Sequence, residues 1–136
     1  MTGIVVVSHS RELAEAAVGL AAGLVPGMDV RVEVAAGLED GGLGTDATEV
    51  MEAIERADDG SGVLVLADLG SGIMSAETAL ELLDPEVAER VRLSPAPLVE
   101  GLVGAYSAAG IGRDLDAVAE EAEGAVEAKR EQVSAG

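Results

Sequence analysis

The one histidine of the sequence, His9, stands where an apolar run gives way to polar residues. The segment GIVVVSHSREL, residues 3–13, carries it directly after a run of valines. Asp68 has the same position after a second apolar run, residues 63–67, and the sequence LGSG follows it. A carboxylate that accepts the N–H of one imidazole nitrogen leaves the lone pair of the other nitrogen free to act as nucleophile, base or ligand. The sequence therefore predicts His9 as the reactive group and Asp68 as the acid that orients it.

Strands and helices alternate along the chain. The apolar runs Ile4–Val7 and Val63–Ala67 lack alternation, which is typical of strands buried on both faces of a parallel sheet. Residues 28–35 alternate valine with charged residues, so we expect a strand near an edge with one solvated face. A short fourth strand is predicted at residues 91–93. Helices are predicted over 11–24, 46–57, 71–83, 98–108 and 115–130, with a helical turn at Pro85.

Two helices carry more detailed signals. In the first, Leu13, Ala17, Leu20 and Leu24 recur at helical spacing and predict the buried face. In the second, Asp46 and Glu49 have the spacing of a capping box.

This order predicts an α/β three-layer sandwich with a mainly parallel sheet, right-handed crossovers and a flavodoxin-like strand order 2-1-3-4. The order makes the ends of the first and third strands neighbours, so His9 and Asp68 fall in one crevice. We expect a single domain over residues 1–131 and a frayed tail over 132–136.

The crevice is suited to an anion such as a phosphoryl group. Backbone N–H groups at helix N-termini bind anions, and here Ser10, Gly70, Ser71 and Gly72 are placed to supply such donors. GSG lacks the spacing and the lysine of a Walker loop, and the first lysine of the chain is Lys129, so an ATP-cleaving site of that type is excluded.

Composition narrows the chemistry further. The absence of cysteine and the single histidine argue against thiolate nucleophiles and common zinc or iron–sulfur sites, so we expect no metal and no resident cofactor. Eight basic against 26 acidic residues give a net charge of -18, which opposes binding to nucleic acid or an anionic membrane. No run reaches the roughly 18 apolar residues of a membrane span, and no export signal is evident. These features predict a cytoplasmic protein.

Two other functions fit parts of this pattern. A signalling receiver would be phosphorylated on Asp68, although the acidic residues that receivers carry after the first strand and their later lysine are replaced here by SHS and a lysine-free stretch. A hydrolase would use Ser8 or Ser10 with His9 and Asp68, but neither serine lies in a G-x-S-x-G elbow.

Four segments resemble a known family: VVVSHSRELAEA, GTDATEVMEAIE, VLVLADLGSGIMSAETALELL and VRLSPAPLVEGLVGAYSAA. They are similar to the phosphotransferase subunit of phosphoenolpyruvate-dependent dihydroxyacetone kinase, whose domain is similar to the mannose-type IIA domain of the bacterial sugar phosphotransferase system. The resemblance is strongest from Gly3 to about Ala109, and GSxxxSAETALELL followed by APLVEG is its most specific part.

The resemblance implies a phosphoryl carrier. His9 would take a phosphoryl group from the histidine phosphocarrier protein, expected here as a separate protein. It would pass the group to ADP on the nucleotide-binding kinase subunit, and the ATP so formed would phosphorylate dihydroxyacetone on a third subunit. Asp68 matches the acid beside the histidine, Gly70 and Ser71 match the loop facing the phosphoryl group, and Thr45 matches a polar loop residue. The family likeness also implies a homodimer.

Overall fold

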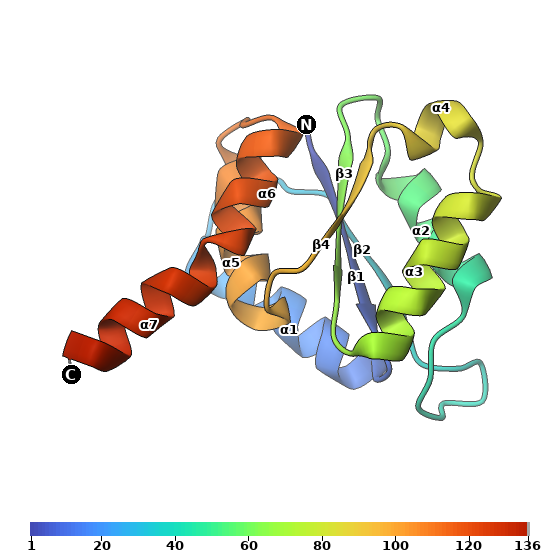
Figure 1. The fold of residues 1–136 in the computed structure, drawn as a ribbon, viewed down its shortest axis with the longest axis horizontal. Coiled ribbons are helices and arrows are strands. Elements are labelled where there is room, and N and C mark those ends of the chain that lie inside the picture. The colour runs from blue at the N-terminus through green and yellow to red at the C-terminus, as the bar shows by residue number, and fades with distance from the viewer. Residues whose placement is uncertain (136) are drawn as a thin grey trace.

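The computed structural model describes residues 1–135 and contains a four-stranded sheet in the predicted order, β2-β1-β3-β4 (Figure 1). All three strand pairs are parallel. The strands are β1 (Gly3–Ser8), β2 (Val32–Ala36), β3 (Val63–Ala67) and β4 (Val91–Ser94). The strand expected over residues 28–35 is therefore shorter at its start, and it occupies the edge that its alternation predicts.

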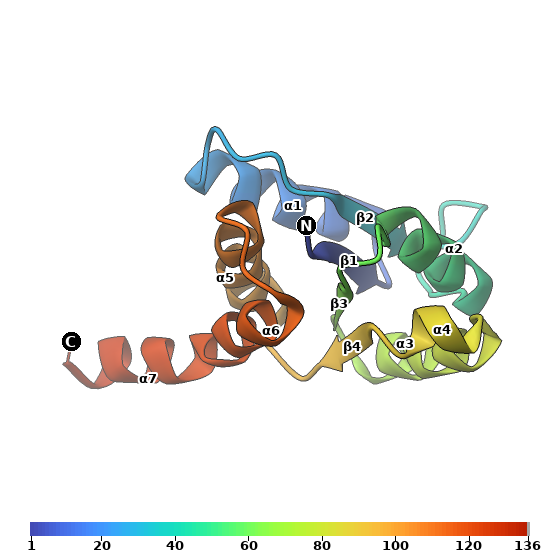
Figure 2. The same cartoon turned by 90° about the horizontal axis from the view of Figure 1, so that it is seen from above.

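Helices cover both faces of this sheet. They are α1 (Arg11–Leu24), α2 (Ala47–Ala57), α3 (Gly70–Leu82), α4 (Pro85–Ala88), α5 (Leu98–Gly110), α6 (Leu115–Glu123) and α7 (Ala125–Ala135). Figure 2 shows α1, α5 and α6 on one side of the sheet and α2, α3 and α4 on the other. The three-layer α/β sandwich predicted from the sequence is confirmed.

The two central strands bury both of their faces, which explains their uninterrupted apolar sequences. Ile4 and Val6 of β1 pack with α1, α5 and α6, whereas Val5 and Val7 pack with α2 and α3. The residues of β3 divide between the two cores in the same way. Each central strand thus lies between two apolar cores. Polar residues can follow only at the end of the strand, where the chain leaves these cores.

The buried face of α1 differs from the predicted one. Ala17 is buried as expected, but Leu13, Leu20 and Leu24 are 45%, 46% and 62% exposed. The helix instead buries Ala14, Ala17 and Ala21 in the core that it shares with α5. Small side chains allow α1 to lie close to the sheet and to α5, so spacing alone identified the wrong one of two apolar faces.

The helix predicted over residues 115–130 is two helices that meet at Gly124. Helix α6 buries Val118, Ala119 and Ala122, whereas no side chain of α7 is buried. Beyond Gly124 the helix no longer packs into the core, and Figure 1 shows α7 extending away from the body of the domain. Of the tail expected to fray, residues 132–135 continue α7, and Gly136 lies outside the described residues.

The capping box expected at α2 is only half formed. Asp46 caps the helix by accepting the Thr48 N–H at 2.8 Å. The carboxylate of Glu49 pairs instead with Arg11, the first residue of α1, at 2.5 Å. None of the described helices is both long enough and apolar enough to cross a membrane.

A close contact between β1 and α2 generates a stability prediction. A Cβ at Gly3 would overlap the carbonyl oxygen of Ala57, while a Cβ at Gly19, on an exposed part of α1, would meet nothing within 4 Å. We expect Gly3→Ala to lower the free energy of unfolding by about 1–3 kcal/mol because backbone would have to move. Gly19→Ala should raise it by about 0.5–1 kcal/mol, since alanine favours a helix more than glycine does. Urea unfolding of both variants measures the difference, and an unchanged midpoint for Gly3→Ala would contradict the packing.

Candidate functional site

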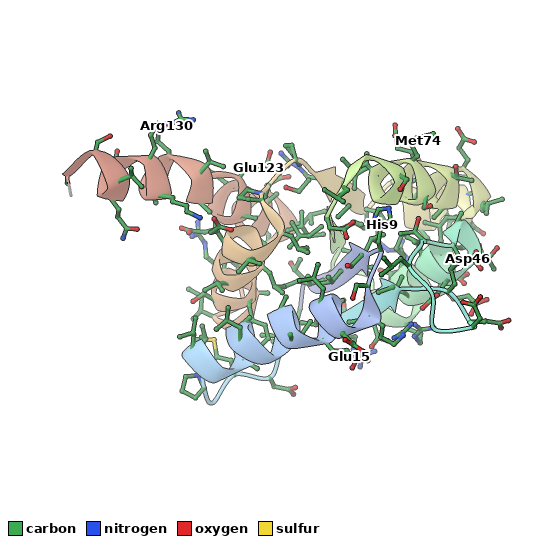
Figure 3. All side chains as sticks on the ribbon, turned by 90° about the horizontal axis from the view of Figure 1, so that it is seen from below. His9, Glu15, Asp46, Met74, Glu123 and Arg130 are labelled. Atoms are coloured by element: carbon green, nitrogen blue, oxygen red, sulfur yellow. The ribbon has the colours of Figure 1, made fainter. Side chains whose placement is uncertain are left out.

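His9 and Asp68 meet at the carboxyl edge of the two central strands. The parallel register pairs Val7 of β1 with Ala67 of β3, so the residues just beyond the strands emerge side by side. The His9 Nδ1 lies 2.9 Å from Asp68 Oδ1. Figure 3 shows His9 between α1 and α3, whose N-termini begin at this edge.

The carboxylate of Asp68 accepts four hydrogen bonds. Oδ1 accepts from His9 Nδ1 at 2.9 Å and from the Leu69 N–H at 2.7 Å. Oδ2 accepts from the His9 N–H at 2.9 Å and from the Ser8 hydroxyl at 3.0 Å. Burial by itself would raise the pKa of Asp68, but the hydrogen bonds from His9, Leu69 and Ser8 outweigh it and hold the pKa below its ordinary value. The group is therefore an ionised acceptor at neutral pH.

An ionised Asp68 determines which nitrogen of His9 carries the proton. A carboxylate can only accept, so Nδ1 must be the N–H and Nε2 of the neutral ring keeps its lone pair. The Ser71 hydroxyl contacts Nε2 and can donate to its lone pair, so this hydroxyl must turn away before Nε2 attacks another atom. The His9 side chain is 24% exposed.

The two serines that flank His9 have supporting positions. Ser8 is fully buried, and its hydroxyl both donates to Asp68 and accepts the Ser10 N–H at 3.1 Å. Ser10 was predicted to supply a backbone N–H to the phosphoryl group, but that N–H donates to Ser8. The Ser10 hydroxyl caps α1 by accepting the Leu13 N–H at 3.2 Å. Sequence reasoning considered Ser8 only as a nucleophile; a polar residue at the last position of a buried strand was the available signal for its structural role.

The N-terminus of α3 lies open beside the ring. Its N-cap, Leu69, makes no side-chain capping bond, and Gly70, Ser71 and Gly72 form the first turn. The first N–H groups of a helix have no partner within it, so this turn offers donors to an anion. Gly70 and Ser71 are exposed there. Gly72 is buried, and a Cβ on it would come within 3.0 Å of Asp68 Oδ1.

The hydroxyl of Thr45 contacts Ser71 and Ser75 of α3 rather than the ring of His9. This hydroxyl lies 2.6 Å from the Ser75 hydroxyl and donates to the carbonyl of Ser71 at 3.4 Å. The preceding N–H, that of Gly44, donates to the carbonyl of His9 at 2.9 Å. Thr45 therefore connects the loop after β2 to α3, and Ser75, which sequence reasoning missed, is its partner.

This constellation combines a nucleophilic nitrogen with donors for an anion. Within residues 1–135, no group of three or more His, Asp or Glu side chains is arranged to hold a metal ion. The chemistry that the site supports on its own is attack by Nε2 on an electrophilic centre that carries negatively charged oxygens.

Comparisons with known proteins identify the family of the chain. Residues 3–119 match the family model EIIA-man, described as the PTS system fructose IIA component. The chain is 49% identical over 135 residues to the PEP-dependent dihydroxyacetone kinase, phosphoryl donor subunit DhaM, of Escherichia coli, covering 98% of this chain and 29% of that protein. It is 32% identical over 121 residues to the PTS-dependent dihydroxyacetone kinase, phosphotransferase subunit DhaM, of Lactococcus lactis, covering 89% and 93%.

A solved structure shares the fold over most of the chain. A crystal structure of a protein of unknown function superposes with a TM-score of 0.81 at 30% identity, over 90% of this chain and 92% of that one. The chain spans less than a third of the length of its Escherichia coli relative, 29%. The match of the family model over most of the sequence shows that the chain belongs to the EIIA-man family.

Proposed function

We propose that this protein is a phosphoryl carrier of a phosphoenolpyruvate-dependent dihydroxyacetone kinase. His9 accepts a phosphoryl group from the histidine phosphocarrier protein and passes it to ADP bound to the kinase subunit. The observation that carries the proposal is the hydrogen bond of 2.9 Å between His9 Nδ1 and the ionised Asp68, which leaves Nε2 as the nucleophile. The names of the relatives, a phosphoryl donor subunit and a phosphotransferase subunit, support the same role.

The proposed transfer has two steps, one from the phosphocarrier protein to His9 and one from His9 to ADP. The Nε2 lone pair attacks phosphorus in line with the P–N bond of the carrier's phosphohistidine, and the electrons of that bond return to the carrier's ring. In the second step an oxygen of the ADP β-phosphate attacks phosphorus, and the bond to Nε2 breaks. The ring gains positive charge while it holds the phosphoryl group, so the Asp68 carboxylate stabilises this state. The N–H groups of the first turn of α3 are placed to hold the phosphoryl oxygens.

The partners in this proposal are the phosphocarrier protein and the ADP-binding and dihydroxyacetone-binding kinase subunits. Phosphoryl relay requires short encounters, and the net charge of -18 would steer a partner with a basic docking surface. The family likeness supports a homodimer, and the proposed partners would place it in the cytoplasm. The proposed role requires no resident cofactor, nucleic acid or membrane.

A receiver phosphorylated on Asp68 is less well supported. Both carboxylate oxygens already accept two hydrogen bonds, and the side chain is only 10% exposed. The chemistry of the linkage separates the two functions, because phosphohistidine is stable in alkali and lost in acid, whereas the acyl phosphate of an aspartate is lost in alkali.

A hydrolase built on Ser8 or Ser10 conflicts with the contacts of both hydroxyls, which serve Asp68 and the N-terminus of α1. Instead, Ser71 contacts one ring nitrogen of His9 and Asp68 contacts the other, the series of contacts that serine hydrolases also use. Turnover of a simple ester that disappears in Ser71→Ala would favour this second candidate.

The first test of the carrier role is His9→Ala. With phosphoenolpyruvate, the energy-coupling enzyme and the phosphocarrier protein, the native chain should acquire one alkali-stable phosphoryl group. The variant should acquire none, because the accepting nitrogen is gone. Intact-mass measurement and labelling report the result, and undiminished labelling of the variant would refute the proposal.

The second test is Asp68→Asn. Each carboxylate oxygen of Asp68 accepts two hydrogen bonds, and an amide replaces one of these oxygens with an NH₂ group, which cannot accept them. The substitution also removes the negative charge beside the ring. We expect the rate of phosphorylation of His9 to fall by roughly a hundredfold or more, since the tautomer is no longer imposed. Rapid-quench labelling measures the rate. A native rate in the variant would show that Asp68 does not orient the ring.

The lowered pKa of Asp68 also predicts how stability depends on pH. A carboxylate whose pKa is lower in the folded chain stabilises the fold above its unfolded pKa, about 4, and loses that contribution as pH falls further. The difference in unfolding free energy between the native chain and Asp68→Asn should therefore shrink as pH falls from about 4 to about 2. Urea unfolding across this range measures it, and a difference that stays constant or grows there would contradict the assigned direction.

A further inference from the structure

The first turn of α3 carries Ser71 but has little intrinsic stability. Two of its three residues, Gly70 and Gly72, are glycines, and the N-cap residue Leu69 supplies no side-chain acceptor. Glycine is a poor helix former, and an uncapped N-terminus frays readily. A capping side chain would occupy the N–H groups that the proposed function leaves open for the phosphoryl oxygens. The turn therefore needs support from outside the helix.

The loop between β2 and α2 reaches both sides of the site. Its first residue, Gly37, donates its N–H to the carbonyl of Ser8 at 3.2 Å, and Gly44 donates to the carbonyl of His9 at 2.9 Å. Gly44 has a φ of 151°, and a Cβ there would press against Leu38 at 3.0 Å. The next residue, Thr45, contacts α3. Two consecutive residues thus join the backbone of His9 to the helix that carries Ser71.

The hydroxyl of Thr45 has two partners on α3. It lies 2.6 Å from the Ser75 hydroxyl, and either residue can donate in that contact. When Ser75 donates, the one hydroxyl proton of Thr45 is available for the Ser71 carbonyl at 3.4 Å. A serine inside a helix commonly bonds the carbonyl four residues back, which here is that of Ser71. Ser75 contacts Thr45, and these contacts connect the loop to the first turn of α3.

We propose that Thr45 and Ser75 are positioning residues that hold the Ser71 hydroxyl against His9 Nε2. They act through Ser71 and contact neither the ring nor the phosphoryl group. The sequence match placed Thr45 among the residues that stabilise the phosphoryl group, and its contacts favour this indirect role. The kinetic part of the inference rests on the proposed function; the arrangement of the resting site does not.

The experiment compares Thr45→Val and Ser75→Ala with Thr78→Val, a matched control on the exposed face of α3 one turn further on. The first measurement is the ¹⁵N spectrum of the His9 ring in the unphosphorylated protein. The Nε2 signal reports whether that nitrogen accepts a hydrogen bond, so we expect it to shift in both positioning variants and to stay in the control. The Nδ1 signal should stay in all three, because the bond to Asp68 is intact.

The second measurement is phosphoryl transfer from the phosphorylated carrier protein. At saturating carrier we expect the rate constant to fall by about tenfold in Thr45→Val and Ser75→Ala, with KM for the carrier unchanged. The Ser71 hydroxyl must leave the Nε2 lone pair during the reaction and can then donate to the phosphoryl oxygens, and misplacing such a group slows the reaction without weakening docking. Thr45→Ser should restore both the Nε2 signal and the rate because it restores the hydroxyl. Thermal unfolding of each variant checks that the fold is retained.

Each outcome decides the question. Native Nε2 signals and native rates in Thr45→Val and Ser75→Ala would overturn the inference, as would an equal effect in Thr78→Val. If Thr45→Val does not fold, Ser75→Ala and Thr45→Ser carry the comparison. If the native chain is not phosphorylated at all, the proposed function fails, whereas the ring spectrum still tests the positioning role.

Discussion

The carboxylate of Asp68 is the group on which the arrangement of the site depends. It accepts hydrogen bonds from the ring and the backbone of His9, from Ser8 and from Leu69, and so joins the ends of the two central strands. Because these bonds outweigh the penalty of burial, the pKa of Asp68 is lowered and the group stays ionised. One charged acceptor therefore connects the ends of β1 and β3, and it also determines which nitrogen of the histidine keeps its lone pair.

The surrounding fold serves to bring that acceptor to the ring. The parallel pairing of β1 with β3 brings the residues after Val7 and Ala67 to the same height, and strand order makes them neighbours. Both strands are apolar on both faces, so their polar groups are confined to the carboxyl ends. Gly72 keeps α3 close to Asp68, since a larger residue would press on its carboxylate. Strand packing, strand order and the charge of Asp68 thus together determine where His9 lies at the carboxyl edge of the sheet.

The same edge shows a compromise between stability and access. An uncapped, glycine-rich first turn of α3 is weak, yet it leaves N–H groups and Ser71 exposed beside Nε2. The loop that carries Gly44 and Thr45 supports this turn from the side without covering it. In the proposed function two protein partners reach this site in succession, and lateral support suits that role because a cap placed over the turn would obstruct both.

The sequence by itself determined the fold class, the strand order, most helix bounds and the closeness of His9 to Asp68, because these follow from the hydrophobic period and from the polar residues that end the two buried strands. It did not determine which face of α1 is buried, because the alanine face and the leucine face are both apolar. Which of them is buried depends on how close α1 lies to α5. Nor did the sequence determine the break at Gly124, which follows from where the core ends. The partners of Ser8, Thr45 and Ser75 were likewise decided only by tertiary structure, since hydrogen bonds between residues 30 or 60 positions apart leave no local pattern in a sequence.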